Sequence, residues 1–305
     1  MDQRNKSKTG LKFMNTLFKN PVFRLLVPKS LRTTLWKAYI EKRILEWYEN
    51  STDPEIIDII KNIKSNGLEI ISTSLTKKYD ADDIVVFNDP DKNLKYVNYK
   101  KDKRLYFKKK WSKRRIQKAL NELYIEQDLN SPHRYLTSNF DVDHNTIVAD
   151  IGCAEANFSL DIIDRVKHIY LFEGERTWSE PLLATFQAYK DKVTLINKRF
   201  STEDTANSID GKKFLKDKNI NFFKIDVDGA EEEVMSTIAD TLNHAKQMKV
   251  ALCTYHAQED FATYSNKLKT LNFEVSSSNG YIIFLWDKSL GPPYLRRGLL
   301  RAQKR

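Results

Sequence analysis

Cysteine is nearly absent from this 305-residue chain, which has only Cys153 and Cys253. These two residues have no metal-ligand spacing and cannot build a disulfide framework. No apolar run approaches the ~20 residues that a membrane-spanning helix needs. The opening residues MDQRNKSK also lack the apolar core of a signal peptide. We therefore expect a cytoplasmic protein whose 41% hydrophobic content forms one large domain with appendages.

The net charge of +10 is concentrated at the two ends of the chain. Residues 1–50 hold eleven Lys and Arg against four Asp and Glu, and residues 291–305 hold five basic residues and no acid. These ends contribute +7 and +5, so the residues between them carry −2. A basic groove through the fold is not indicated, and no Asn/Asp-Pro-Pro-Tyr base-binding motif is present. We expect no nucleic-acid partner.

We expect four segments. Residues 1–50 form a basic amphipathic arm, and residues 51–135 form an α+β accessory or cap region. Residues 136–290 form the main domain, and residues 291–305 form a basic tail. In the arm, apolar and basic blocks are broken by Pro21 and Pro28. Such short helices can lie on an anionic membrane face or pack against their own domain, and the pattern fits both. In the accessory region, two aromatic runs around the turn KKDK predict a β-hairpin within residues 94–107.

The main domain shows short apolar runs that alternate with helical patterns. The expected strands are Ile147–Ile151, Ile169–Glu173, Val193–Asn197, Phe222–Asp226, Val250–Tyr255, Phe273–Ser276 and Tyr281–Trp286. Alternating strands and helices predict an α/β fold with a mostly parallel, Rossmann-like sheet of seven strands, covered on both faces. Only SSSNG separates the last two runs, too little for a parallel crossover, so the last strand is expected to be antiparallel.

The loop after the first strand lacks the three glycines of a dinucleotide-binding fingerprint. Residues 147–160 read IVADIGCAEANFSL, with Gly152 alone in the loop. Asp150 stands at the strand end, and Glu155 and Asn157 offer polar contacts nearby. The second expected strand ends in Glu173, whose carboxylate can accept both ribose hydroxyls. A ribose without phosphate beside a positive centre describes S-adenosylmethionine, which we expect as the cofactor.

Three motifs resemble the FkbM-type S-adenosylmethionine-dependent methyltransferases: VADIGCAEANFSL at 148–160, YLFEGE at 170–175 and FKIDVDGAE at 223–231. The resemblance covers about residues 136–290, and the IDVDGAE stretch is its most specific part. It implies a class I methyltransferase fold and methyl transfer to a hydroxyl oxygen. Where family loops usually have a glycine at the start of the helix, this chain has Ala156.

Methyl transfer to a hydroxyl requires alignment of the acceptor and removal of its proton. Asp226 ends the fourth expected strand, and Asp228 and Glu231 follow it. His256 ends the neighbouring strand, so these side chains are expected to meet. Asp226, His256 and Glu231 are the expected catalytic residues, and Asp226 is also expected beside the cofactor. The three carboxylates and His256 are also candidate ligands of a divalent metal ion.

The sequence thus predicts an S-adenosylmethionine-dependent O-methyltransferase. The expected acceptor is a small molecule, sugar or glycan, and the basic ends suggest a peripheral membrane or glycan-assembly partner. The alternative is a non-catalytic class I fold that acts as a binding or scaffolding module in a glycan-assembly complex. Cys153 with His256 does not indicate a thiol nucleophile because no third orienting group is apparent. His133, His144 and His168 are expected to be structural or solvated.

Overall fold

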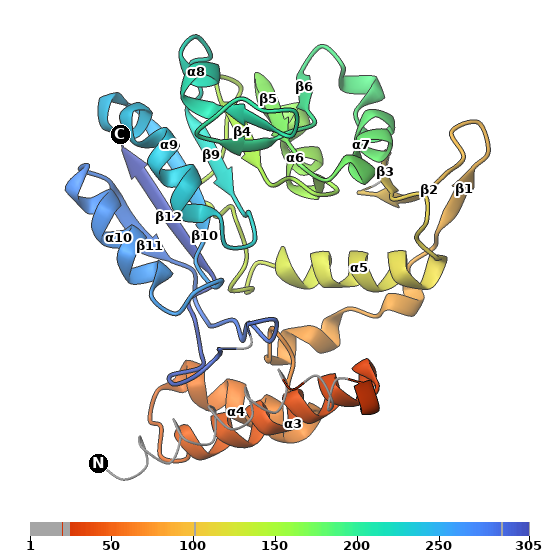
Figure 1. Cartoon of the computed structure of the whole chain (residues 1–305), viewed down its shortest axis with the longest axis vertical. Coiled ribbons are helices and arrows are strands. Elements are labelled where there is room, and N and C mark those ends of the chain that lie inside the picture. Colours follow the sequence, from red (N-terminus) through yellow and green to blue (C-terminus); the bar gives the residue numbers. More distant parts are fainter. Residues whose placement is uncertain (1–19, 21–24, 101, 288, 305) are drawn as a thin grey trace.

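A seven-stranded sheet forms the centre of the molecule in the computed structural model, which describes residues 20, 25–100, 102–287 and 289–304 (Figure 1). Its strands are β4 (Ile147–Ile151), β5 (His168–Phe172), β6 (Val193–Ile196), β9 (Phe222–Ile225), β10 (Met248–Cys253), β11 (Glu274–Ser277) and β12 (Leu299–Lys304). The order is β11-β12-β10-β9-β4-β5-β6, and only β12 is antiparallel to its neighbours. This is the predicted class I arrangement of a mostly parallel sheet with an antiparallel last strand.

The identity of the last strand differs from the prediction. Residues 281–286 form no strand, apart from an isolated bridge between Ile282 and Arg296. Ile283 instead packs with Trp36, Ile40 and other residues of the N-terminal helices, so this apolar run serves a second hydrophobic cluster. The antiparallel strand is instead β12, which lies between β10 and β11 and falls inside the segment predicted to be a basic tail. The expected hairpin through SSSNG and the expected tail at 291–305 are therefore both wrong.

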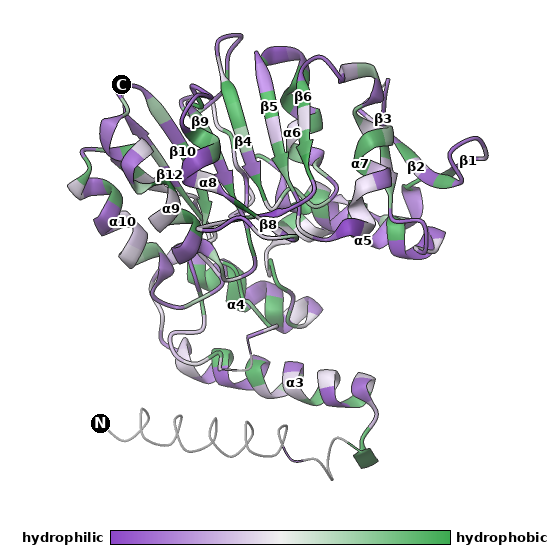
Figure 2. Ribbon diagram, turned by 45° about the horizontal axis from the view of Figure 1, so that its top comes forward, coloured by the Kyte–Doolittle hydropathy of each residue, from purple (hydrophilic) through white to green (hydrophobic). Residues whose placement is uncertain are grey.

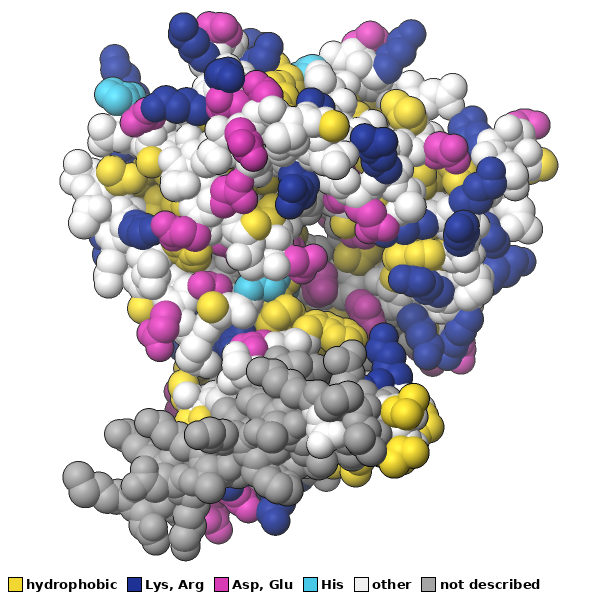
Figure 3. Space-filling view, viewed as in Figure 1, with side chains coloured by type: hydrophobic (Ala, Val, Ile, Leu, Met, Phe, Trp, Pro, Cys, Tyr) yellow, Lys and Arg dark blue, Asp and Glu magenta, His cyan; other side chains and the backbone are white. Residues whose placement is uncertain are grey.

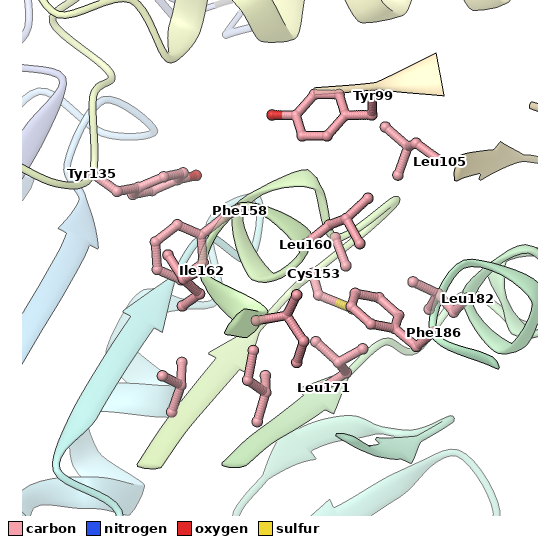
Figure 4. Close-up of a cluster of buried hydrophobic side chains, with 14 of the residues drawn as sticks. Tyr99, Leu105, Tyr135, Cys153, Phe158, Leu160, Ile162, Leu171, Leu182 and Phe186 are labelled. Carbon is pink, nitrogen blue, oxygen red and sulfur yellow. The ribbon is translucent and has the colours of Figure 1, made fainter. Parts of the chain in front are cut away.

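Helices cover both faces of the sheet, and alternate strand residues enter two different cores. One core contains Val148 and Leu171 with residues from α5 (Lys113–Glu126), α6 (Asn157–Ile162) and α7 (Ser179–Thr185). Figure 4 shows part of it, with the Cys153 side chain among Leu160, Leu171 and Phe186. The other core contains Ala149 and Phe172 with residues from α8 (Gly211–Leu215), α9 (Glu231–His244) and α10 (Asp260–Thr270). Apolar residues concentrate in the strands between these layers (Figure 2).

The segments before the main sheet pack onto it as a cap. β1 (Phe87–Asp89), β2 (Leu94–Tyr99) and β3 (Lys103–Phe107) form an antiparallel sheet, which confirms the predicted hairpin. A small parallel ladder joins β7 (Arg199–Ser201) to β8 (Ser208–Asp210) elsewhere in the main domain. Helix α5 then crosses beside the carboxyl ends of the main strands (Figure 1).

The two N-terminal helices α3 (Lys29–Trp47) and α4 (Pro54–Asn66) lie below the sheet domain (Figure 1). Helix α3 begins directly after Pro28 and buries Trp36, Ile40 and Ile44, so this part of the predicted arm packs on its own chain. The rest of the arm, residues 1–19 and 21–24, lies outside the described residues. Every helix in the described ranges is too short or too polar to cross a membrane.

Candidate active site

A cavity of about 460 Å³ opens at the carboxyl ends of β4, β5 and β9, where ligands bind in open α/β sheets. Its lining includes five of the six residues predicted to bind the cofactor, Gly152, Glu155, Asn157, Glu173 and Asp226, together with the candidate metal ligand Asp228. In the space-filling view, acidic side chains lie in a hollow near the centre of this face (Figure 3). Cap residues Leu123, Glu126, Gln127 and Tyr135 close one side of the cavity.

The single glycine in the loop after β4 is required by the fold itself. Gly152 has φ +74°, and a Cβ at this position would collide with the backbone oxygen of Asp226. The first loop therefore lies directly against the end of β9, which brings two predicted motifs together. Ala154 and Ala156 in the same loop also have left-handed backbones, with φ of 46° and 58°. Ala156 thus has a conformation that glycine adopts more easily.

Asp150 does not line the cavity, contrary to the prediction that it contacts the cofactor. Its side chain is fully buried, where Ser159 Oγ donates a 2.7 Å hydrogen bond to Oδ2 and Lys224 Nζ lies 3.1 Å from Oδ1. Lys224 also donates to the Gly152 carbonyl at 2.7 Å. Burial opposes the charge of Lys224, but Asp150 and Asp226 raise its pKa overall. Asp150 therefore holds Lys224, which ties the first loop to β9.

Glu173 lies at the rim of the cavity with its carboxylate held in place by the backbone. Oε2 accepts a hydrogen bond from Ala154 N at 2.9 Å, and Oε1 accepts one from Glu175 N at 2.6 Å. Partial burial raises the pKa of this carboxyl despite these two bonds. Each oxygen can accept a second hydrogen bond. The backbone thus fixes the position of this carboxylate, which lines the cavity.

Asp226 stands at the end of β9 among four aromatic side chains. Oδ2 accepts a 2.9 Å hydrogen bond from Tyr135 Oη, and Oδ1 accepts one of 3.3 Å from Tyr255 Oη. His133 Nε2 lies 3.7 Å from Oδ2, and His256 Nε2 lies 3.9 Å from Oδ1. Burial acts to raise the pKa of Asp226, but Lys224 and the two histidines lower it overall. Asp226 therefore presents a stable negative charge to the cavity.

His256 and Glu231 lie beneath Asp226 and do not line the cavity. Nδ1 of His256 is 2.8 Å from Oε1 of Glu231, and Nε2 is 3.5 Å from Oδ1 of Asp228. Burial disfavours the imidazolium, but Asp228 and Glu231 raise the pKa of His256 to about 10. His256 is therefore protonated at neutral pH in this arrangement. This state does not fit the predicted role of a lone general base.

Two further carboxyls in the cavity resist ionisation. Burial raises the pKa of Glu155 to about 7 and raises that of Glu126 well above its ordinary range. The charge of Asp226 adds to both effects. Lys224 and Arg199 are the basic residues in the lining. Because acidic groups outnumber them, a ligand with a positive centre would be stabilised here.

Comparison with solved structures finds weak similarities over about half of the chain. The precorrin 8W decarboxylase of Methanobacterium thermoautotrophicum is 19% identical over 54% of this chain and 83% of that one, with a TM-score of 0.36. The precorrin-6y C5,15-methyltransferase of Geobacter metallireducens is 15% identical over 55% of this chain and 85% of that one, with a TM-score of 0.38. A dimethyladenosine transferase of Plasmodium falciparum is 10% identical over 54% of this chain and 57% of that one, with a TM-score of 0.38. No protein-family profile and no curated protein matches the chain.

The site also contains residues that the sequence did not single out. Lys224 lies in the strand before Asp226, but nothing in the pattern showed that a buried lysine would face Asp150 and Gly152. His133 was expected to be structural or solvated, and it is buried within 3.7 Å of Asp226, where burial lowers its pKa to about 4. Tyr135 and Tyr255 lie 120 residues apart in sequence and converge on one carboxylate. Tyr255 follows the end of β10, whereas Tyr135 lies in the segment between α5 and β4, so no common signal in the sequence marked the pair.

Proposed function

We propose that this chain is an S-adenosylmethionine-dependent methyltransferase of the FkbM type. One observation carries the proposal: the single-glycine turn after β4 and the acid after β5 line the same cavity. Glu173 is held there by two backbone N–H groups, with further lone pairs for the ribose. The loop 152–157 has no glycine-rich cradle for a pyrophosphate, which favours a nucleoside ligand over a dinucleotide.

The electrostatics of the cavity support a ligand with positive charge. Burial raises the pKa of Glu126, Glu155 and Glu173, so placing all three charges together without a counter-charge is unfavourable. S-adenosylmethionine has a sulfonium centre and an ammonium group. When bound, it supplies an electrophilic methyl group, and the protein's part is to align the acceptor with it.

We further propose that the acceptor is a hydroxyl of a small molecule, sugar or glycan. Asp226 would bind or orient the hydroxyl, since it is charged, fixed by two tyrosines and exposed to the cavity. Partial burial raises the pKa of Glu155 to about 7, and a carboxyl with this pKa is suited to accept a proton near neutral pH. His256 would act through Asp226, because it does not reach the cavity.

An acceptor screen with isotope-labelled S-adenosylmethionine tests the proposal. The panel should contain free sugars, oligosaccharides and small alcohols, and we expect label transfer to at least one of them. Asp226→Asn should then lower turnover by roughly 10²-fold, because a positioned charged group is lost. Asp240→Asn, on the exposed side of α9, is the matched control and should retain wild-type turnover.

Two other outcomes would count against parts of this proposal. If cofactor binds but no acceptor is methylated, the non-catalytic alternative of a binding or scaffolding module gains support. If Asp226→Asn transfers methyl groups as fast as the wild type, Asp226 does not act on the acceptor.

A further inference from the structure

Three side chains with metal-binding atoms converge just below the cavity floor. Asp226, Glu231 and His256 each offer one ligand atom, and all three atoms lie within 4.8 Å of one another. Ligands that share a metal at about 2.1 Å can lie up to about 4.2 Å apart. Small rotations of these side chains would therefore bring the three atoms onto one ion. They come from the end of β9, the first turn of α9 and the loop after β10.

The second observation is the state of His256. Its residue exposure is only 8%, and among the described residues neither ring nitrogen finds a hydrogen-bond partner of suitable geometry. Carboxylate oxygens of Glu231, Asp228 and Asp226 surround the ring at 2.8, 3.5 and 3.9 Å. Buried polar atoms without hydrogen bonds are rare, and they often mark a missing water or ion.

The charge around His256 also favours a cation. Three carboxylates face one imidazole, so the cluster remains negative even when the ring is protonated. A divalent ion would replace the ring proton as the charge that offsets the carboxylates. One imidazole with two carboxylates is a donor set suited to first-row divalent ions such as Mn²⁺ or Zn²⁺.

We propose that Asp226, Glu231 and His256 bind one divalent first-row metal ion. Asp228, whose side chain is 97% exposed, lies on the solvent side of this site and would guide the ion in. The ion would sit against Asp226 at the floor of the cavity, where it could bind an oxygen of the acceptor. Metal binding by the free protein needs no methyl donor, so this proposal stands or falls separately from the proposed function.

A second cluster shares Asp226 but is the weaker site. His133, Asp226 and Cys253 also place ligand atoms within 4.8 Å of one another. Here, however, His133 Nε2 already contacts Tyr255 Oη at 3.3 Å and Cys253 Sγ at 3.5 Å. Cys253 is fully buried, and burial raises the pKa of its thiol, which opposes the thiolate that a metal requires. The two histidines therefore provide a matched comparison.

The experiment is titration of the chelator-treated full-length chain with Mn²⁺, followed by the electron paramagnetic resonance signal of the free ion. We expect one saturable site per chain in the wild type. His256→Gln and Glu231→Gln should each weaken binding at least ~10-fold, because each removes a direct ligand. His133→Gln should bind Mn²⁺ like the wild type, since His133 is not a ligand of this site. Circular dichroism establishes that each variant is folded.

Absence of saturable binding in the wild type would overturn the proposal, whatever the variants do. Wild-type affinity in folded His256→Gln would overturn it as well. If His133→Gln loses binding and His256→Gln keeps it, the ion belongs to the second cluster. If His256→Gln does not fold, the wild-type titration and Glu231→Gln decide the question.

Discussion

Glu155 is a cavity carboxyl that titrates near neutral pH. Burial raises its pKa to about 7, above the ordinary value of 4.5. The folded chain therefore binds this proton more tightly than the unfolded chain does. Its contribution to stability is fully present below pH 4.5 and is lost as the pH rises through 7.

Glu155→Gln should accordingly stabilise the fold at neutral pH. The neutral amide avoids the cost of a buried charge, which we expect to be about 1–3 kcal/mol at pH 8. Below pH 4.5, the variant and the wild type should unfold at nearly the same temperature. Thermal unfolding from pH 4 to pH 8 measures the difference, with the exposed Glu180→Gln as the control. A difference that is constant across this range would contradict the raised pKa.

Single residues also show what the sequence could and could not predict. Gly152 and Glu173 were predicted as site residues because both follow buried strands, and parallel strands end at a common edge. Both line the cavity. Asp150 satisfied the same rule but points behind the sheet edge to Lys224 and Ser159. The rule that ligands bind at the carboxyl ends of parallel strands locates the backbone of the site. The direction of each side chain depends on neighbours that are distant in sequence.

At the scale of elements, strand β12 is the feature on which the sheet depends most. It pairs with β10 on one side and with β11 on the other, and Leu299, Leu300 and Ala302 are fully buried. Arg301 extends from the same strand and donates a 2.9 Å hydrogen bond to the Tyr135 carbonyl. Because Tyr135 binds Asp226, this strand also supports the site.

A chain that ends at residue 290 should therefore fail to fold cooperatively. It would lose the strand between β10 and β11 and expose the apolar faces that β12 covers. Circular dichroism and thermal unfolding should show no sharp transition for this truncated chain. Gln303→Ala changes one partly exposed side chain of the same strand and should unfold within a few degrees of the wild type. A cooperative transition in the truncated chain would show that β12 is dispensable.

Six of the seven sheet strands were predicted at nearly the right residues, because most of them are short apolar runs between helical patterns. The exception is instructive. Residues 281–286 are apolar and β-prone, but alternate residues of this run, Tyr281, Ile283 and Leu285, pack with α3 and α4. The true strand begins LLRA and carries basic residues, which made it appear to be a solvated tail. Arg301 is buried because its guanidinium binds backbone carbonyls, an arrangement that only the folded structure reveals.

For the whole molecule, a cap of N-terminal segments closes one side of a cavity at the edge of a class I sheet. The sheet supplies Gly152, Glu173 and Asp226, and the cap supplies Glu126 and the aromatic ring of Tyr135. The residues that line the cavity lie between positions 123 and 255 of the sequence. We propose that this cavity holds the nucleoside of S-adenosylmethionine, with its ribose on Glu173.

Calorimetric titration with S-adenosylhomocysteine tests that claim most directly, because this product binds without turnover. The wild type should bind one molecule per chain. Glu173→Gln should bind at least ~10-fold more weakly, because the amide replaces a charged acceptor of ribose hydroxyl bonds. Glu180→Gln, on the exposed side of α7, should bind like the wild type. Failure of the folded wild type to bind, or equal binding by Glu173→Gln, would contradict the assignment of this cavity.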